Sequence, residues 1–198
     1  MKNNKKLKFV HITKTSGTYI ENLGKQKNIN WGRHDKCLKK RKGGYWHFPL
    51  QFLNTYPYKD NIKLFTIVRN PYDRIISECL CKYGSTHAKK METKKDLNIY
   101  INEQVSIKKK LNLSFLHFLP QHLYTHKEGK QIIDFIIKYE EINKFNDLMK
   151  DYSIDIKYVQ KKNNKNKKFN VNDISKENID LINNVYHLDF VYYNYKKM

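Results

Sequence analysis

Short apolar runs and polar turns alternate along the first part of the chain. Residues 7–12 (LKFVHI) form an apolar run that predicts a buried strand. A polar turn follows, and residues 18–23 have the spacing of a short helix that Gly24 would close as a C-cap. Residues 64–68 (LFTIV) are apolar and β-branched, which predicts a second buried strand. The pattern therefore begins as strand, turn, helix and strand.

The segment after the second predicted strand carries strong signals for the start of a helix. Asn70 is a favoured N-cap residue, and Pro71 suits the first helical position. Asp73 places a carboxylate in the first turn, where it complements the helix macrodipole. Apolar residues then recur with helical spacing and predict a buried face made of Ile75, Ile76, Cys79 and Leu80.

The rest of the chain continues this alternation. Residues 132–137 predict a third strand and residues 155–159 a short fourth one, while the Lys-rich residues 83–118 contain helical stretches. Ser175 is placed to cap a final helix. Apolar positions with helical spacing are Ile142, Phe145, Leu148, Met149 and Tyr152 in one segment, and Ile179, Ile182, Tyr186, Phe190 and Tyr193 in the last.

This order of elements predicts an α/β fold. Strands that alternate with helices build three layers around a mostly parallel central sheet. In such folds ligands bind beyond the carboxyl ends of the strands, and the turns at Lys14 and Arg69 lie at two of these ends. A length of 198 residues is typical of one domain, so we expect a single domain over residues 1–198.

Composition narrows the class of protein. Hydrophobic residues make up 39% and aromatic residues 14% of the chain, which excludes a disordered protein. Cys37, Cys79 and Cys81 are an odd number of cysteines, so we expect reduced thiols rather than a disulfide scaffold. No apolar run approaches the ~20 residues that span a membrane, and the polar first residues do not resemble a signal peptide. We therefore expect a soluble, cytoplasmic protein.

The chain also carries a large excess of positive charge. It has 39 Lys and Arg residues against 19 Asp and Glu residues, which gives a net charge of +20. Such a field attracts anions, among them nucleic acids, acidic lipids, acidic glycans and multiply charged nucleotides. A general bias toward Lys codons explains part of the excess equally well, so charge alone does not select one partner.

The turn after the first predicted strand has the composition of a phosphate cradle. It contains Lys14, whose charge would face an anion, and Gly17, which lets the backbone approach closely. Thr15, Ser16 and Thr18 add hydroxyl groups. The turn is not a Walker A motif, because its Lys precedes the Gly. The alternative is an ordinary connection between a strand and a helix.

Arg69 and Ser77 form a second candidate group. Arg69 leaves the second predicted strand toward the same sheet edge as the Lys14 turn, and Ser77 follows two helical turns later. Arg is well suited to bidentate recognition of a terminal phosphate. Taken alone, both residues also fit a solvated strand end and an ordinary helix position.

Together these segments resemble the sulfotransferases, specifically the Golgi-type carbohydrate group. HITKTSGTYIENL is similar to the family form H-x-P-K-x-[GS]-G-T, and FTIVRNPYDRIISEC is similar to V-R-[ND]-P-Y-[DE]-R-x-x-S. Two weaker resemblances follow in order, in YEEINKFNDLM and in IDLINNVYHLDFVYYNY. The four segments span nearly the whole chain. The resemblance implies a P-loop-like sulfotransferase fold and 3′-phosphoadenosine 5′-phosphosulfate (PAPS) as sulfuryl donor, with adenosine 3′,5′-bisphosphate as its product.

The resemblance also implies roles for individual residues. The 5′-phosphosulfate end of PAPS would be held by Lys14, Thr15, Ser16, Gly17, Thr18 and Tyr19. The 3′-phosphate would be held by Arg69 and Ser77, with help from Lys167 or its neighbours Lys165 and Lys168. Thr13 stands where the family usually has Pro, and the membrane anchor typical of Golgi members is not seen.

Sulfuryl transfer to a hydroxyl group requires positioning, charge stabilisation and a general base. Lys14 would stabilise charge on the bridging oxygen of the leaving group. His47 is the first candidate for the base, because it resembles in position the histidine base of the 2-O-sulfotransferases and an ordinary His titrates near neutral pH. His34 and Glu78 are the alternatives. No metal is expected, although His122 and His126 have i,i+4 spacing, with His117 nearby.

The expected acceptor is a hydroxyl-bearing molecule, in the first place a glycan, and an acidic one would suit the basic surface. Gln121 either faces this acceptor or is a turn residue. Two other functions stay open from the residues alone. A kinase-like nucleotide-binding protein lacks the Walker spacing and an acidic Mg²⁺ ligand here. A nucleic-acid-binding protein fits the charge and the tyrosines, but it has no need of two anion-binding turns. The sequence indicates no oligomeric state.

Overall fold

The computed structural model describes residues 6–35, 46–52, 58, 61–81, 91–109, 113, 116–159 and 168–198. Their contacts divide the chain into two compact units. Unit 1 is Met1–Val68 with Leu123–Gln160, and unit 2 is Arg69–His122 with Lys161–Met198. The single domain expected over residues 1–198 stays a prediction.

Unit 1 is built on a parallel sheet of three strands among the described residues. The strands are β1 (Lys6–Val10), β2 (Ile62–Val68) and β5 (Phe135–Lys138), in the order β1-β2-β5. Phe9 pairs with Phe65, and Phe65 pairs in turn with Phe135. A separate antiparallel hairpin joins β3 (His126–Lys127) to β4 (Lys130–Gln131). The prediction of a mixed α/β fold with a parallel sheet is confirmed.

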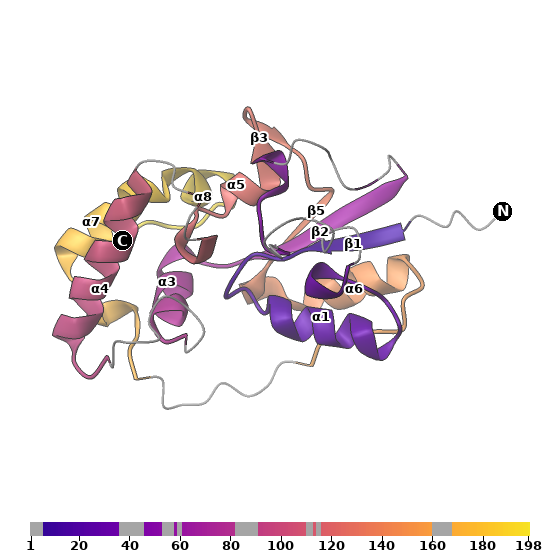
Figure 1. Cartoon of the computed structure of the whole chain (residues 1–198), viewed down its shortest axis with the longest axis horizontal. Coiled ribbons are helices and arrows are strands. Elements are labelled where there is room, and N and C mark those ends of the chain that lie inside the picture. Colours follow the sequence, from indigo (N-terminus) through magenta and orange to yellow (C-terminus); the bar gives the residue numbers. More distant parts are fainter. Residues whose placement is uncertain are drawn as a thin grey trace. The chain divides into compact units, whose positions relative to one another are not determined.

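Two helices cover one face of this sheet, as Figure 1 shows for α1 (Gly17–Gln26) and α6 (Asn143–Asp151). Alternate strand residues such as Phe9 and Phe65 point to this face, because successive side chains of a strand face opposite sides. They pack with Ile20 of α1 and Phe145 of α6 in one buried cluster. Four short segments complete the described part of unit 1: η1 (Gly32–His34), η2 (Leu50–Phe52), η5 (Tyr139–Glu141) and most of α5 (His122–Thr125).

Unit 2 is helical in its described part. Its elements are α3 (Pro71–Cys79), α4 (Lys94–Ser106), η3 (Ile107–Lys109), η4 (Leu116–Phe118), η6 (Val171–Asp173), α7 (Lys176–Val185) and α8 (His187–Tyr192). The predicted caps are present, because the Asn70 side chain accepts from the N–H of Tyr72 and Ser175 from that of Asn178. The apolar faces of α3, α4, α7 and α8 share one core.

Several predicted boundaries were wrong. Residues 155–159 are not a strand, and β1 ends at Val10 rather than at residue 12. The third strand begins at Phe135, three residues later than predicted. The first helix does not end at Gly24 but continues to Gln26. Leu80 is not on the buried face of α3, since it lies beyond the last helical residue and is 41% exposed.

Candidate functional site

The turn between β1 and α1 has the backbone of an anion-binding loop. Lys14 and Ser16 both take left-handed conformations, with φ of 60° and 72°, and α1 begins directly afterwards at Gly17. Ser16 is the N-cap residue, yet its side chain makes no capping hydrogen bond, and the first turn of α1 contains no acidic residue. The first N–H groups of a helix have no partner within the helix. Together with the helix dipole they favour an anion at this turn.

Gly17 is required here because of its neighbour His11. A Cβ atom at position 17 would lie 2.3 Å from the His11 ring, far closer than any van der Waals contact. His11 is itself buried, and its Nδ1 donates to Glu21 at 2.8 Å. The His11 imidazole therefore packs directly against the turn at position 17, where only glycine leaves room for it.

Glu21, on α1, holds the His11 imidazole in this position. Its side chain is fully buried and accepts from His11, from the Arg33 N–H at 2.9 Å and from Arg33 Nε at 2.7 Å. Gly32, with a φ of 50°, makes room for the carboxylate, because a Cβ there would lie 1.9 Å from Oε1. Burial by itself would raise the pKa of Glu21. The hydrogen bonds and charges of His11 and Arg33 outweigh it and lower the pKa below its usual 4.5.

The predicted 5′-phosphosulfate residues lie together in this turn, with different exposures. Thr15 is buried, and its hydroxyl donates to the Ile12 carbonyl at 2.8 Å. The Thr15 hydroxyl is therefore engaged by the main chain, and the role of Thr15 in anion binding stays a prediction. Ser16 is hydrogen-bonded to the Tyr158 hydroxyl at 3.0 Å, and Tyr19 packs edge-on against the same ring. Lys14 and Thr18, half-buried and exposed respectively, remain at the surface of the turn.

His47 lies on the same side of unit 1 as the turn. Its ring centroid is 6.4 Å from that of His11, whose ring in turn touches Gly17. Trp46 packs edge-on against His47 at 5.1 Å, and the imidazole is half-buried. His34, the second candidate base, is half-buried at the end of η1. The structure therefore places the first candidate base beside the candidate phosphosulfate turn.

Arg69 and Ser77 belong to unit 2. Arg69 is one of two residues between the end of β2 and the start of α3. Its side chain is 13% exposed, and Nη2 lies 3.9 Å from Asp73. Ser77 is half-buried on α3. Arg69 is held at its main chain by Gln121, which is buried and lies in a turn, as one of the two expectations for it stated.

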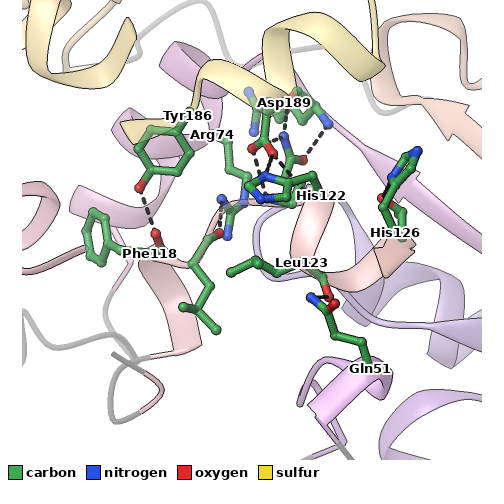
Figure 2. A network of polar contacts seen from close by, with 12 residues as sticks. Gln51, Arg74, Phe118, His122, Leu123, His126, Tyr186 and Asp189 are labelled. Atoms are coloured by element: carbon green, nitrogen blue, oxygen red, sulfur yellow. Dashed lines mark hydrogen bonds and ion pairs between the residues drawn. The ribbon is translucent and has the colours of Figure 1, made fainter. Parts of the chain in front are cut away.

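Figure 2 shows how buried side chains hold the segment that carries Gln121. Arg74 donates to the carbonyls of residues 117 and 119, and Tyr186 donates to that of Phe118. Asp189 accepts from the N–H groups of Gln121 and His122, and also from His122 Nδ1. Arg74, Tyr186 and Asp189 all lie within segments that carry the family resemblance. They fix the backbone of residues 117–122 inside unit 2.

Glu78, the third candidate base, is part of a buried pair. Its Oε2 accepts from His117 Nδ1 at 2.9 Å, and its side chain is 1% exposed. The carboxylate is thus shielded from solvent, while the His117 side chain is 29% exposed. Cys79 is buried as expected of a core thiol, and burial raises its pKa above the usual range.

The other candidate residues named from the sequence lie in several parts of the chain. Lys165, Lys167 and Cys37 lie outside the described residues, whereas Lys168 is exposed, with its Nζ 5.8 Å from the Phe169 ring. His126 Nδ1 is hydrogen-bonded to Thr125, so it and His122 have protein partners. Within the described ranges no three His, Cys, Asp or Glu residues gather as a metal site would need.

Among the described parts of the chain, no helix is both long and apolar enough to cross a membrane.

Each unit thus contains one of the two predicted groups. Unit 1 brings together residues 14–19 and His47, and unit 2 contains Arg69 and Ser77. Sequence reasoning missed the supporting residues Glu21, Arg74 and Asp189. Their signal was available in the motif segments, which contain all three. Gln121 had no such signal, because its partner Arg69 is 52 residues away.

Comparison with known proteins supports one assignment. The chain matches no curated protein and no solved structure. The model of the sulfotransferase family matches residues 1–196, which is nearly the whole chain, and the family uses PAPS as sulfuryl donor. Such enzymes have a P-loop-like fold. With this match added to the geometry of the β1–α1 turn, the chain belongs to the sulfotransferase family.

Proposed function

We propose that this protein transfers the sulfuryl group of PAPS to a hydroxyl group of a glycan. The observation that carries the proposal is the turn between β1 and α1, with two left-handed residues, an obligatory glycine and a helix start without a side-chain cap. An anion of the size of a phosphosulfate suits this arrangement of N–H groups. We also propose that the helices and the parallel sheet form the three layers of a P-loop-like sulfotransferase fold.

Residues 14–19 would hold the 5′-phosphosulfate end of the donor. Gly17 and Thr18 would contribute main-chain N–H groups at the start of α1, and Thr15 would contribute through its main chain. Ser16 presents a hydroxyl that Tyr158 orients, and Tyr19 supports the same tyrosine ring. Lys14 supplies the positive charge, which offsets negative charge on the leaving oxygen during transfer.

Arg69 and Ser77 would hold the 3′-phosphate that distinguishes PAPS from most other nucleotides. The guanidinium of Arg69 presents several donors in a fixed fork, which matches a phosphate group. Lys167 is proposed as a further contact, with Lys165 and Lys168 as alternatives, on the family resemblance alone. We propose no metal ion for this site.

His47 is proposed as the general base. When bound, PAPS supplies a sulfuryl group that already has a good leaving group. The acceptor hydroxyl becomes a stronger nucleophile if the His47 imidazole takes its proton as the new S–O bond forms. The 6.4 Å between the rings of His47 and His11 supports this role, because His11 underlies the turn. His34 and Glu78 are the alternatives, and the burial of Glu78 weakens its case.

An acidic glycan is the acceptor we favour. The net charge of +20 would attract such a molecule from solution and raise its rate of association. The described residues contain no pattern that selects a particular sugar or hydroxyl position.

Thermal unfolding with adenosine 3′,5′-bisphosphate tests the nucleotide site. A ligand at 100 times its Kd stabilises the folded state by about 2.7 kcal/mol. For a chain of this size that corresponds to a rise in Tm of roughly 5–10 °C. We expect this rise with the bisphosphate and a clearly smaller one with ATP, AMP or a short DNA duplex. Stabilisation by the duplex alone would contradict the proposal.

Three variants then assign the roles. Lys14→Ala should abolish sulfuryl transfer to an acceptor mixture with labelled PAPS, whereas Lys25→Ala, at an exposed position of α1, should retain it. His47→Ala should lose turnover but keep the Tm rise with the bisphosphate. Turnover that persists in His47→Ala would move the base to another residue, with His34→Ala as the next variant.

A further inference from the structure

The Gln121 side chain makes two hydrogen bonds to the main chain of Arg69. Its Oε1 accepts from the Arg69 N–H at 2.8 Å, and its Nε2 donates to the Arg69 carbonyl at 2.8 Å. The orientation of the amide follows from chemistry, because an N–H can only donate and a carbonyl can only accept. One side chain thus satisfies both backbone groups of a residue that lies outside any helix or strand.

Gln121 is in turn fixed by Asp189. The Gln121 N–H donates to Asp189 Oδ2 at 2.8 Å, and its Nε2 lies 3.4 Å from the same oxygen. Asp189 Oδ1 accepts from the His122 N–H and from His122 Nδ1. Both Gln121 and Asp189 are 0% exposed. A buried polar group without its partners costs about 1–3 kcal/mol, so this arrangement has little freedom to rearrange.

The arrangement continues to the Arg69 side chain. The β2 strand ends at Val68 and Asn70 caps α3, so Arg69 stands between two elements that fix its neighbours. The side-chain amide of Gln121 fixes the peptide groups on both sides of the Arg69 Cα atom. The direction in which the guanidinium leaves the backbone is therefore set from within unit 2.

We propose that Gln121, anchored by Asp189, is a positioning residue that aims Arg69 at the 3′-phosphate of the nucleotide. The inference rests on the proposed function, because it takes the 3′-phosphate as the ligand of Arg69. Gln121 lies outside the segments that carry the family resemblance, so the inference assigns a role to a further part of the chain. The selectivity for a 3′-phosphate then depends on a side chain that does not touch the nucleotide.

The test compares the affinity for adenosine 3′,5′-bisphosphate with that for AMP, which lacks the 3′-phosphate. Isothermal titration measures both, and their ratio reports the 3′-phosphate contact alone. Gln121→Met keeps the volume of the side chain and removes both hydrogen bonds to Arg69. We expect the ratio to fall about tenfold, the size of one charge-assisted hydrogen bond. Gln121→Leu, which also removes both hydrogen bonds to Arg69 and adds no charge beside Asp189, should lower the ratio as well and serves if the Met variant does not fold.

Tyr186→Phe is the matched control. It removes one buried hydrogen bond to the same segment, that from the Tyr186 hydroxyl to the Phe118 carbonyl at 2.7 Å, without touching Arg69. We expect a lower Tm and an unchanged affinity ratio. A role limited to stability would give the Gln121 variants this same result and would overturn the proposal.

A double-mutant cycle separates this inference from the proposed function. Arg69→Ala should lower the ratio, and Gln121→Met should have no further effect on the ratio in the Arg69→Ala background. Equal effects of Gln121→Met in both backgrounds would overturn the positioning role. A wild-type protein that does not prefer the bisphosphate to AMP would contradict the proposed function itself.

Discussion

At the scale of single residues, the turn that we propose as the donor site depends on a side chain that would not touch the donor. Glu21 holds His11 and Arg33, and His11 fills the space behind Gly17. The charge of Glu21 is buried, but three hydrogen-bond donors compensate it. Removing one partner of such a buried ion pair lowers the free energy of unfolding by more than the intact pair contributes to it, because the other charge is left buried without a partner.

Glu21→Gln should therefore lower the free energy of unfolding by about 3 kcal/mol at neutral pH. Its folded-state pKa lies below the usual 4.5, so the unfolded chain binds the proton more readily. The stability contributed by the ionised Glu21 is present above pH 4.5 and is lost as the pH falls through the folded-state value. Urea unfolding at several pH values should show the difference between wild type and Glu21→Gln shrinking below pH 4.5.

Glu128→Gln is the control for this series. Glu128 is an exposed carboxylate between β3 and β4, and surface substitutions of this kind change stability by less than about 0.5 kcal/mol. A gap between wild type and Glu21→Gln that stays constant from pH 7 to pH 3 would mean that Glu21 does not stabilise the turn through its charge.

At the scale of elements, α3 depends on its N-cap. The Asn70 side chain accepts from the Tyr72 N–H at 3.0 Å, and its carbonyl accepts from the Arg74 N–H. Asn70→Ala should lower the free energy of unfolding by about 1 kcal/mol, whereas Asn70→Asp should keep most of it, because Asp also caps helices well. Urea unfolding measures both.

Asn22→Ala gives the opposite expectation on an exposed helix position. Asn22 lies within α1, where Ala is the better helix former, so stability should stay equal or rise slightly. If Asn70→Ala behaves like Asn22→Ala, the cap does not stabilise α3.

The sequence predicted those elements whose signals are local. The strand before Arg69, the caps Asn70 and Ser175 and the buried face of α6 all follow from neighbouring residues. The turn between β1 and α1 was likewise predicted from residues 13–18, and its role in phosphate binding stays a prediction. These features depend on hydrogen bonds and spacing within a few positions of the chain.

The errors come from contacts with distant side chains. Residues 155–159 have the composition of a strand, but the Tyr158 N–H donates to the Asn146 side chain at 2.6 Å rather than to a neighbouring strand. The start of β5 is delayed because Asp134 uses its side chain to accept from the Leu64 N–H. Gly24 does not end α1. Its role is to make room for the Trp31 ring, because a Cβ atom at position 24 would lie 2.7 Å from that ring.

The same limit applies to the candidate site. The residues of the motifs that would touch the donor could be named from the sequence, because their types match the chemistry of an anion. The role of Gln121 could not, because it depends on hydrogen bonds to Arg69 and Asp189, which are 52 and 68 positions away in the sequence. The position of His47 beside His11 also depends on folding, because the two residues are 36 positions apart in the sequence.

At the scale of the whole molecule, the net charge of +20 offers two kinds of anion binding. A nucleotide held at the β1–α1 turn would be bound through a few oriented groups that are partly buried. A nucleic acid would be bound by lysines distributed over the surface. Salt separates the two, because exposed charges are screened far more strongly than buried ones.

We therefore expect different salt dependences for two ligands of the wild-type protein. Binding of a short DNA duplex, followed by fluorescence anisotropy, should weaken by about 10³-fold or more between 50 and 200 mM salt if six or more phosphates are contacted. Binding of adenosine 3′,5′-bisphosphate, followed by titration calorimetry, should weaken far less over the same range. Lys14→Ala should abolish the second and leave the first nearly unchanged, since it removes one of 39 basic residues. Bisphosphate binding that weakens with salt as steeply as duplex binding does would mean that exposed surface charge, and not the turn, determines what this protein recognises.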